Sequence, residues 1–159
     1  MTPGELSHTG PSGEARMVDV GAKADTARSA TASGIIRMQP DTLDAIQANT
    51  IKKGDVVSVA RVAAIMAAKR TAELIPLCHP VALTDVQVSV EPDRGLPGLR
   101  VTISCSAVGK TGVEMEALSA VSICLLTIYD MAKGLDRGME ISDITVCEKR
   151  GGRSGHWKR

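Results

Sequence analysis

Two segments in the middle of the chain alternate between apolar and polar residues. In residues 84–91, TDVQVSVE, the valines face one way and the polar residues face the other, and residues 99–107, LRVTISCSA, follow the same two-residue period. The link between them, PDRGLPG at residues 92–98, is rich in glycine and proline, which is typical of a hairpin loop. We therefore predict two adjacent strands, each with one buried face.

Two longer segments have the period of helices. Residues 55–74 contain VVSVARVAAIMAAKR, which is apolar around most of its circumference and rich in alanine, so this helix should be buried at close approach to a neighbour. Asp55 is an acceptable N-cap for it. A second long helix is predicted over residues 112–133, where Thr111 and Glu114 have the spacing of a capping box.

The remaining elements complete an α+β pattern. Residues 31–38 and 139–149 are predicted to be strands, and residues 41–50 a short helix. The order strand, helix, helix, strand, strand, helix, strand is a split βαβ with one inserted helix. We therefore predict a ferredoxin-like fold, with helices packed on one face of an antiparallel sheet. The polar face of that sheet must then contact water or another subunit.

The two ends of the chain show no sustained periodic pattern of hydrophobic residues. Residues 1–30 are rich in Gly, Ser, Thr, Ala and charged residues, and residues 151–159, GGRSGHWKR, are glycine-rich and basic. We expect a flexible N-terminal arm and a flexible C-terminal tail. Residues 31–150 then form a single ferredoxin-like domain. A chain of 159 residues buries roughly 70% of its unfolded surface without metal or disulfide staples.

Composition excludes several classes of function. The formal net charge is +1 and the aromatic residues are Tyr129 and Trp157, so the basic field and the stacking aromatics of nucleic-acid binders are both missing. The four cysteines form no CxxC pair, which favours reduced thiols over a zinc ribbon or a redox motif. No segment approaches the ~20 apolar residues of a membrane span. We expect a cytoplasmic protein that binds neither nucleic acid nor membrane.

The stretch IPLCHPVAL, residues 75–83, places a cysteine and a histidine on a stiff loop. Pro76 and Pro80 fix their own φ angles and restrain the residues before them. His79 is either a loop histidine with an ordinary hydrogen bond or a catalytic group. Nearby cations favour the second interpretation, because cations clustered without aromatic residues suit a phosphorylated small molecule. These cations are Lys53, Lys69, Arg70, Lys149 and Arg150.

The run SAVGKTG, residues 106–112, lies where a strand meets a helix but is not a P-loop. A Walker A motif requires glycine at position 104, and this chain has Ser104. Lys110 is still able to contact an anion near the helix N-terminus. Further along this helix, a mostly polar stripe runs from Glu116 to Asp130. The stripe is either an exposed face with an ion pair or part of an acid–base site, and the residues alone leave both interpretations open.

Four stretches of the sequence resemble one known family. They are MVDVGAKADTAR, KKGDVVSVARVAAIMAAKRTAELIPLCHP, GKTGVEMEAL and LLTIYDMAKG. In this order and spacing they are similar to the cyclic pyranopterin monophosphate synthases, the MoaC-type enzymes of molybdenum cofactor biosynthesis. The resemblance runs from about Met17 to Gly155.

This resemblance implies a ferredoxin-like homohexamer, a trimer of dimers with active sites at subunit interfaces. The implied activity is that of a phosphorus-oxygen lyase, which converts 3′,8-cyclo-7,8-dihydro-GTP to cyclic pyranopterin monophosphate and releases pyrophosphate. The substrate is thus a small-molecule nucleotide and the product a pterin. No cofactor and no metal site are expected to be required, and Mg²⁺ is left open as a companion of the pyrophosphate.

The resemblance also implies roles for particular residues. Asp130 matches the catalytic aspartate of the family, and the catalytic candidates beside it are Lys133, His79 and Lys53. The substrate-binding candidates are Leu77, Cys78, His79, Met115, Glu116, Lys69, Arg70, Lys149, Lys23 and Arg28. Aspartate, lysine and histidine give and take protons during ring opening and closure, while Lys and Arg neutralise a triphosphate.

Two alternatives and one geometric consequence remain at this point. The chain is also compatible with a regulatory module that binds a nucleotide without turnover, or with a structural oligomer whose charges serve assembly. If both carboxylates contact substrate, the distance between Glu116 and Asp130 matters, since fourteen residues of helix span about 21 Å. We therefore expect the two to come from different subunits across a two-fold axis.

Overall fold

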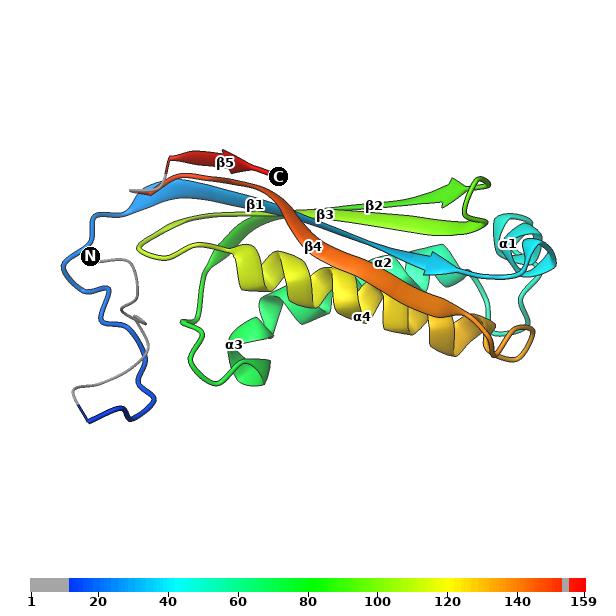
Figure 1. Ribbon diagram of the computed structural model, residues 1–159, viewed down its shortest axis with the longest axis horizontal. Helices are drawn as coiled ribbons and strands as arrows, with labels where there is room; N and C mark the ends of the chain where they lie inside the picture. Colours follow the sequence, from blue (N-terminus) through cyan, green and yellow to red (C-terminus); the bar gives the residue numbers. More distant parts are fainter. Residues whose placement is uncertain (1–11, 153–154) are drawn as a thin grey trace.

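The computed structural model describes residues 12–152 and 155–159, and its centre is a five-stranded antiparallel sheet with the order β2-β3-β1-β4-β5. The strands are β1 (Thr26–Arg37), β2 (Leu83–Asp93), β3 (Gly98–Gly109), β4 (Glu140–Arg150) and β5 (His156–Lys158). β3 lies between β1 and β2 and pairs with both (Figure 1). This is the split βαβ arrangement predicted from the order of the elements.

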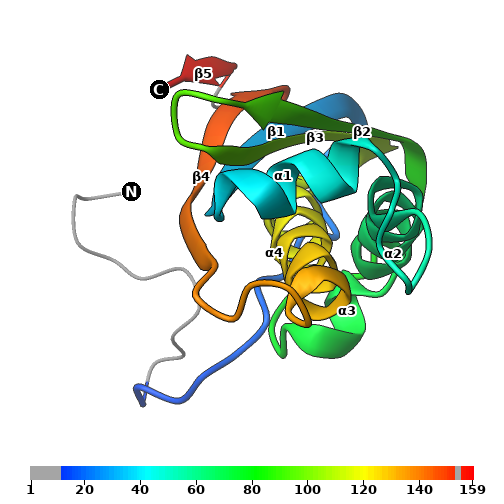
Figure 2. The same cartoon turned by 90° about the vertical axis from the view of Figure 1, so that its right-hand side faces the viewer.

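Helices cover one face of this sheet. They are α1 (Pro40–Gln47), α2 (Val56–Lys69), α3 (Thr71–Leu74) and α4 (Glu114–Ala132). α2 and α4 lie side by side under the sheet and run in opposite directions, and α1 lies at the end of the sheet near the β2–β3 hairpin (Figure 1, Figure 2). The other face is polar, as in the 2.7 Å hydrogen bond between Thr31 Oγ1 and Ser104 Oγ. The predicted α+β fold is confirmed.

The core lies between the sheet and the pair α2 and α4. Small residues let these layers approach closely, because a Cβ at Gly34 of β1 would lie only 2.8 Å from Leu125 Cδ1 of α4. The alanine-rich pattern correctly predicted that α2 is buried against a neighbour at close approach. Fully buried alanines of the two helices are Ala60, Ala64, Ala117 and Ala120.

Both chain ends contribute strands that the sequence pattern did not predict. β1 begins at Thr26, inside the expected flexible arm, and its first half pairs with β3 from Thr26–Gly109 onward. At the other end, β5 pairs with β4 between Glu148–Lys158 and Arg150–His156. These segments lack hydrophobic alternation, and cross-strand pairing decides their conformation. Residues 1–11 and 153–154, which the arm and tail predictions included, lie outside the described residues.

The predicted helix over residues 55–74 is divided in two. Asp55 caps α2 as expected, with its carboxylate accepting a hydrogen bond from the backbone N–H of Ser58 at 2.9 Å. α2 ends at Lys69, and Arg70, with φ −112° and ψ 11°, separates it from α3. Thr71 Oγ1 donates to the carbonyl of residue 67, a bond that bends helices.

The start of α4 also differs from its prediction. α4 begins at Glu114 with Val113 as N-cap, and no side chain among the described residues makes a capping hydrogen bond there. The predicted capping box between Thr111 and Glu114 is therefore wrong, because the Glu114 carboxylate contacts Lys149 instead. Smaller differences occur at α1, which ends at Gln47 short of the predicted end.

α4 is long and apolar enough, by length and composition alone, to cross a membrane. The expectation that no segment approaches the length of a membrane span is therefore wrong for this helix. The helix packs against β1, β3, β4 and α2, and half of its most apolar window is buried within the protein. The core helix of a soluble domain passes the same test, so packing inside the domain accounts for its hydrophobicity.

Gly98 marks a close approach between β3 and β1. A Cβ at this position would clash with the carbonyl oxygen of Ile36, a backbone atom held by the paired strands. We expect Gly98→Ala to lower the free energy of unfolding by about 1–3 kcal/mol, measured by urea denaturation. Gly109→Ala is the control in the same strand, since no atom of the described residues lies within 4 Å of its added Cβ. Equal stabilities of the two variants would contradict the close approach.

Candidate active site

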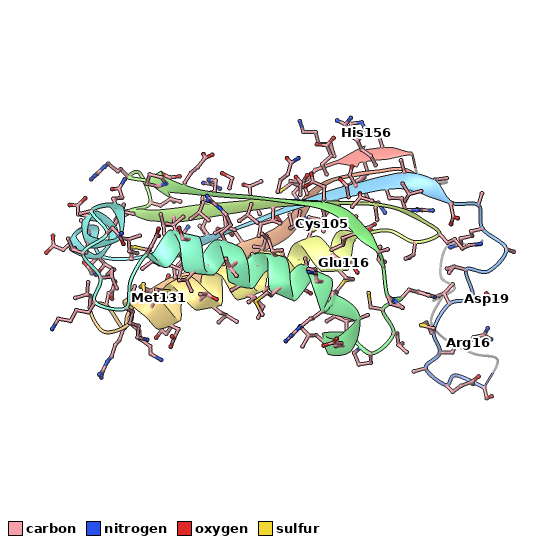
Figure 3. The ribbon with its side chains drawn as sticks, turned by 180° about the vertical axis from the view of Figure 1, so that it is seen from behind. Arg16, Asp19, Cys105, Glu116, Met131 and His156 are labelled. Carbon is pink, nitrogen blue, oxygen red and sulfur yellow. The ribbon has the colours of Figure 1, made fainter. Side chains whose placement is uncertain are left out.

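The candidate residues gather at opposite ends of the helix layer. Because α2 and α4 are antiparallel, the start of α4 lies beside the end of α2, and the end of α4 lies beside the start of α2 (Figure 1). Figure 3 shows Glu116 and Met131 at the two ends of α4. We call the group at the end of α4 the Asp130 cluster; its members are Lys53, Asp130 and Lys133. The group at the start of α4 is the arm-end group; its members are Lys23, Arg28, Cys78, His79, Glu116 and Lys149.

Two lysines contact the carboxylate in the Asp130 cluster. Lys133 Nζ lies 2.7 Å from Asp130 Oδ1, and Lys53 Nζ lies 3.1 Å from Asp130 Oδ2. Lys53 Nζ also donates to the backbone oxygen of Asp130 at 2.8 Å. All three side chains are more than half exposed or close to it, so the cluster is open to a ligand.

Hydrogen bonding keeps this cluster ionised. The hydrogen bond from Lys133, followed by that from Lys53, holds the pKa of Asp130 below its ordinary value, and Asp130 in turn raises the pKa of Lys133. At neutral pH Asp130 is therefore a carboxylate and Lys133 an ammonium, so the pair presents one hydrogen-bond acceptor and one donor to a bound substrate. The structure brings together three of the four predicted catalytic residues. His79 lies in the arm-end group instead.

Glu116 is buried between α4 and the IPLCHP loop. Glu116 is only 2% exposed, so the interpretation that it belongs to an exposed face of the helix is wrong. Cys78 Sγ donates to Glu116 Oε1 at 3.8 Å, and Glu116 Oε2 has no hydrogen-bond partner within the described residues. A buried carboxyl oxygen without a donor is costly, which makes it a place where a ligand N–H or O–H would be stabilising.

Burial shifts the titration of both partners in this pair. Desolvation raises the pKa of Glu116, an effect that hydrogen bonds from its own backbone and from Cys78 partly oppose. Burial, followed by the charge of Glu116, raises the pKa of the Cys78 thiol. Cys78 is therefore a protonated donor at neutral pH and is unsuited to act as a thiolate nucleophile.

The predicted anion-binding residues Lys23, Arg28 and Lys149 line one cavity of about 190 Å³. Lys110 and Glu114 line it as well, and Lys149 Nζ lies 3.0 Å from Glu114 Oε1. Lys23 comes from the segment before β1, Arg28 from β1 and Lys149 from β4, so sheet pairing assembles the cavity. Its size and positive lining suit phosphate groups.

His79 lies next to this cavity on the loop between α3 and β2, together with Leu77 and Cys78. It lines a second cavity, of about 310 Å³, with Lys110 and residues of the N-terminal segment. Lys110 and Thr111 border both cavities, so the two adjoin. The loop histidine is thus placed beside the cation-lined cavity.

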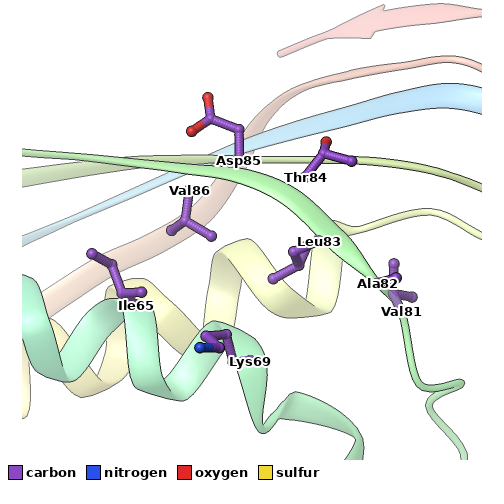
Figure 4. A pocket seen from close by; sticks show the side chains of 8 residues that line it. All are labelled: Ile65, Lys69, Val81, Ala82, Leu83, Thr84, Asp85 and Val86. Atoms are coloured by element: carbon purple, nitrogen blue, oxygen red, sulfur yellow. The ribbon is translucent and has the colours of Figure 1, made fainter.

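The other substrate-binding candidates lie outside the Asp130 cluster and the arm-end group. Lys69 borders a separate groove of about 490 Å³ between α2 and the start of β2, where Ile65, Leu83 and Val86 supply apolar walls (Figure 4). Arg70 is exposed at the junction of α2 and α3. Met115 is 37% exposed in the first turn of α4, beside Glu116.

Sequence reasoning missed the local role of Glu114. Its three-residue spacing from Thr111 indicated a capping box, but its carboxylate accepts a hydrogen bond from Lys149. The signal that favoured this ion pair lay in β4, far away in sequence, and only sheet pairing brings the two together. Within residues 12–152 and 155–159, no group of three or more His, Cys, Asp or Glu side chains is arranged to hold a metal ion.

Known proteins are similar in sequence to this chain over most of its length. The sequence profile described as the MoaC family matches residues 17–152. The chain belongs to the MoaC family. Proteins named cyclic pyranopterin monophosphate synthase from Brucella ovis, Brucella melitensis biotype 2 and Brucella abortus strain 2308 are each 58% identical to it over 154 residues, which is 97% of this chain and 93% of theirs. The resemblance read from the four sequence stretches is confirmed, and both groups of candidate residues fall within the matched MoaC region.

The thiol of Cys78 provides a test of the buried pair. We expect Cys78→Ala to retain most of its activity, because the thiol donates a weak hydrogen bond and forms no thiolate. In the parent protein, iodoacetamide should modify Cys78 slowly at neutral pH, and Glu116→Gln should increase that rate because it removes the neighbouring charge. Peptide-resolved mass spectrometry measures the rate, with Cys147 of β4 as the internal control. A rate unaffected by Glu116→Gln would contradict the contact.

Proposed function

We propose that this MoaC-family protein converts 3′,8-cyclo-7,8-dihydro-GTP to cyclic pyranopterin monophosphate and releases pyrophosphate, as a step of molybdenum cofactor biosynthesis. The observation that carries the proposal is the Asp130 cluster, in which a carboxylate accepts hydrogen bonds from two lysines. The name shared by the Brucella relatives supports the same activity.

The Asp130 cluster suits the rearrangement of the ring system. Water opens the purine-derived ring by addition to carbon, and an amine then closes on the sugar-derived carbon to give the pterin, with loss of water. Each addition and each elimination moves a proton. Asp130 accepts protons at neutral pH, and Lys133 or Lys53 donates them, so the required groups lie within hydrogen-bonding distance of one another.

The cation-lined cavity of the arm-end group suits the phosphate chemistry. A sugar hydroxyl oxygen forms a bond to the α-phosphorus, the bond from that phosphorus to the bridging oxygen breaks, and pyrophosphate leaves with the electron pair. The hydroxyl proton passes to a base, for which His79 is the candidate. Lys23, Arg28 and Lys149 neutralise the charge that develops on pyrophosphate. The proposal requires no cofactor, and any Mg²⁺ travels with the triphosphate or the pyrophosphate.

We further propose that each active site takes residues from two subunits of a homohexamer, arranged as a trimer of dimers. Glu116 and Asp130 lie about 21 Å apart along α4, which exceeds the reach of one nucleotide. Two α4 helices packed antiparallel across a two-fold axis would place Glu116 of one subunit near Asp130 of the other. The exposed side of the helix layer supports subunit contact, since it carries apolar residues of α4 as well as α2. They are Leu126 of α4, 53% exposed, and Val59, Val62 and Met66 of α2, each between 46% and 58% exposed. We place the enzyme in the cytoplasm, in line with its reduced cysteines.

Turnover of the cyclised nucleotide tests the activity directly. We expect the parent protein to release pyrophosphate, and Asp130→Asn and Lys133→Ala to reduce kcat by at least ~100-fold, since proton transfer contributes factors of that size. Circular dichroism should show folded variants, because both side chains are exposed. The matched control is Asp44→Asn, which removes an exposed carboxylate of α1 that lies 3.0 Å from Arg94 and makes no contact with the Asp130 cluster among the described residues. Near-parental rates for either cluster variant would refute its catalytic role.

A mixed oligomer tests the shared site. Glu116→Gln and Asp130→Asn proteins should each be nearly inactive alone. After subunit exchange, hybrids contain some sites in which both residues are native, so about a quarter of the parental activity should return if the partners mix at random. Exchange is followed by mass spectrometry of differently labelled subunits. Demonstrated exchange without recovery of activity would rule out a site made from these two residues across an interface.

A further inference from the structure

We propose that Lys110, in the run SAVGKTG, is a positioning residue that holds the N-terminal segment 21–23 in place so that Lys23 borders the cation-lined cavity. The effect of Lys110 on substrate binding rests on the proposed function, whereas its effect on the N-terminal segment is a property of the protein without substrate. We call the hydrogen bonds from Lys110 Nζ to this segment the Lys110 tether.

The Lys110 tether consists of two short hydrogen bonds. Lys110 Nζ donates to the backbone oxygen of Gly21 at 2.8 Å and to the backbone oxygen of Lys23 at 2.9 Å. The segment is also turned on itself, since the Lys23 N–H donates to the carbonyl of Val20 at 3.0 Å. An ammonium that donates to two carbonyl oxygens fixes the backbone on either side of residue 22.

A second set of bonds runs in the opposite direction. Arg28 Nε donates to the carbonyl of Gly109 at 2.9 Å, and Arg28 Nη2 donates to the carbonyl of Lys110 at 3.2 Å. The register of β1 and β3 pairs Thr26 with Gly109, so the strands end where these side chains cross. The N-terminal segment and the GKTG loop therefore hold each other through two basic side chains and four carbonyl oxygens.

The space around Arg28 leaves little freedom for another arrangement. Gly152 has φ +69°, and a Cβ at this position would clash with the guanidinium of Arg28. The guanidinium is thus enclosed by β4's end on one side and by the GKTG loop on the other. Lys23, Arg28, Lys110 and Lys149 consequently border the same cavity without any of them lying on a common element.

This geometry gives Lys110 a different role from the lysine of a P-loop. Two of its three ammonium protons are used by protein carbonyls, and its effect on an anion is exerted through the placement of Lys23. A segment ordered before the substrate arrives lowers the entropic cost of binding. Loss of the tether should therefore weaken binding of the triphosphate and leave the proton transfers at the Asp130 cluster unchanged.

The first measurement concerns the protein without substrate. Lys110→Met keeps the length of the side chain and removes its donors, and it should increase the rate of tryptic cleavage after Lys23 by about fivefold or more, because the segment opens more often. Lys110→Arg restores donors and should restore most of the protection. Arg94→Met, at the tip of the β2–β3 hairpin, is the control for loss of one surface cation. Unchanged protection in Lys110→Met would overturn the proposal.

The second measurement separates positioning from direct contact with substrate. Lys110→Met and Lys23→Met should each raise KM about fivefold, and kcat should fall in both, because Lys23 neutralises the charge that develops on pyrophosphate. The double variant should resemble Lys23→Met alone, because one acts through the other. Multiplied effects in the double variant would mean that Lys110 acts independently, which would overturn the proposal. If the parent protein shows no turnover, the proposed function is wrong. The proteolysis experiment would still test whether Lys110 holds residues 21–23 in place. In that case calorimetric affinity for inorganic pyrophosphate replaces KM in the cycle.

Discussion

The packing of α4 against the sheet is the constraint on which the rest of the molecule depends. Along its length α4 contacts β1, β3, β4 and α2, and the absence of a side chain at Gly34 allows Leu125 to lie against β1. A helix held on so many sides behaves as a rigid rod. Its two ends therefore keep the Asp130 cluster and the arm-end group at a fixed separation, and chemistry that needs both has to be arranged around that distance.

The two groups differ in how they control protonation. In the Asp130 cluster the side chains remain in contact with solvent, and opposite charges stabilise each other's ionised forms. At the other end of α4, burial of Glu116 works against ionisation, and Cys78 supplies only a weak donor. One carboxyl is thus kept charged by its neighbours and the other is pushed towards its neutral form by exclusion of water. Such divergence between two acidic groups is typical of catalytic proteins.

The periodic pattern of hydrophobic residues predicted most of the fold but only part of the candidate site. The alternation in β2 and β3 and the alanine-rich face of α2 each reflect burial, and burial leaves a clear trace in sequence. The start of β1, with small and polar residues, and β5 gave no such trace, because pairing with a neighbouring strand determines their structure. The ion pair between Glu114 and Lys149 could not be predicted from the sequence either, because it too depends on how the strands pair. The family motifs identified the residues of the Asp130 cluster, whereas the burial of Glu116 and the hydrogen bonds of Lys110 depend on segments that only the fold brings together.

β5 has a consequence for how copies of this protein can meet. Its pairing with residues 148–150, extended by the hydrogen bond from the Arg159 N–H to the carbonyl of Cys147, occupies the backbone groups along the last part of β4. β5 is now the outermost strand at this edge, and with three residues it offers few free backbone groups to a strand from a neighbouring molecule. Residues 156–159 therefore keep the backbone of residues 147–150 from pairing with a strand of another copy.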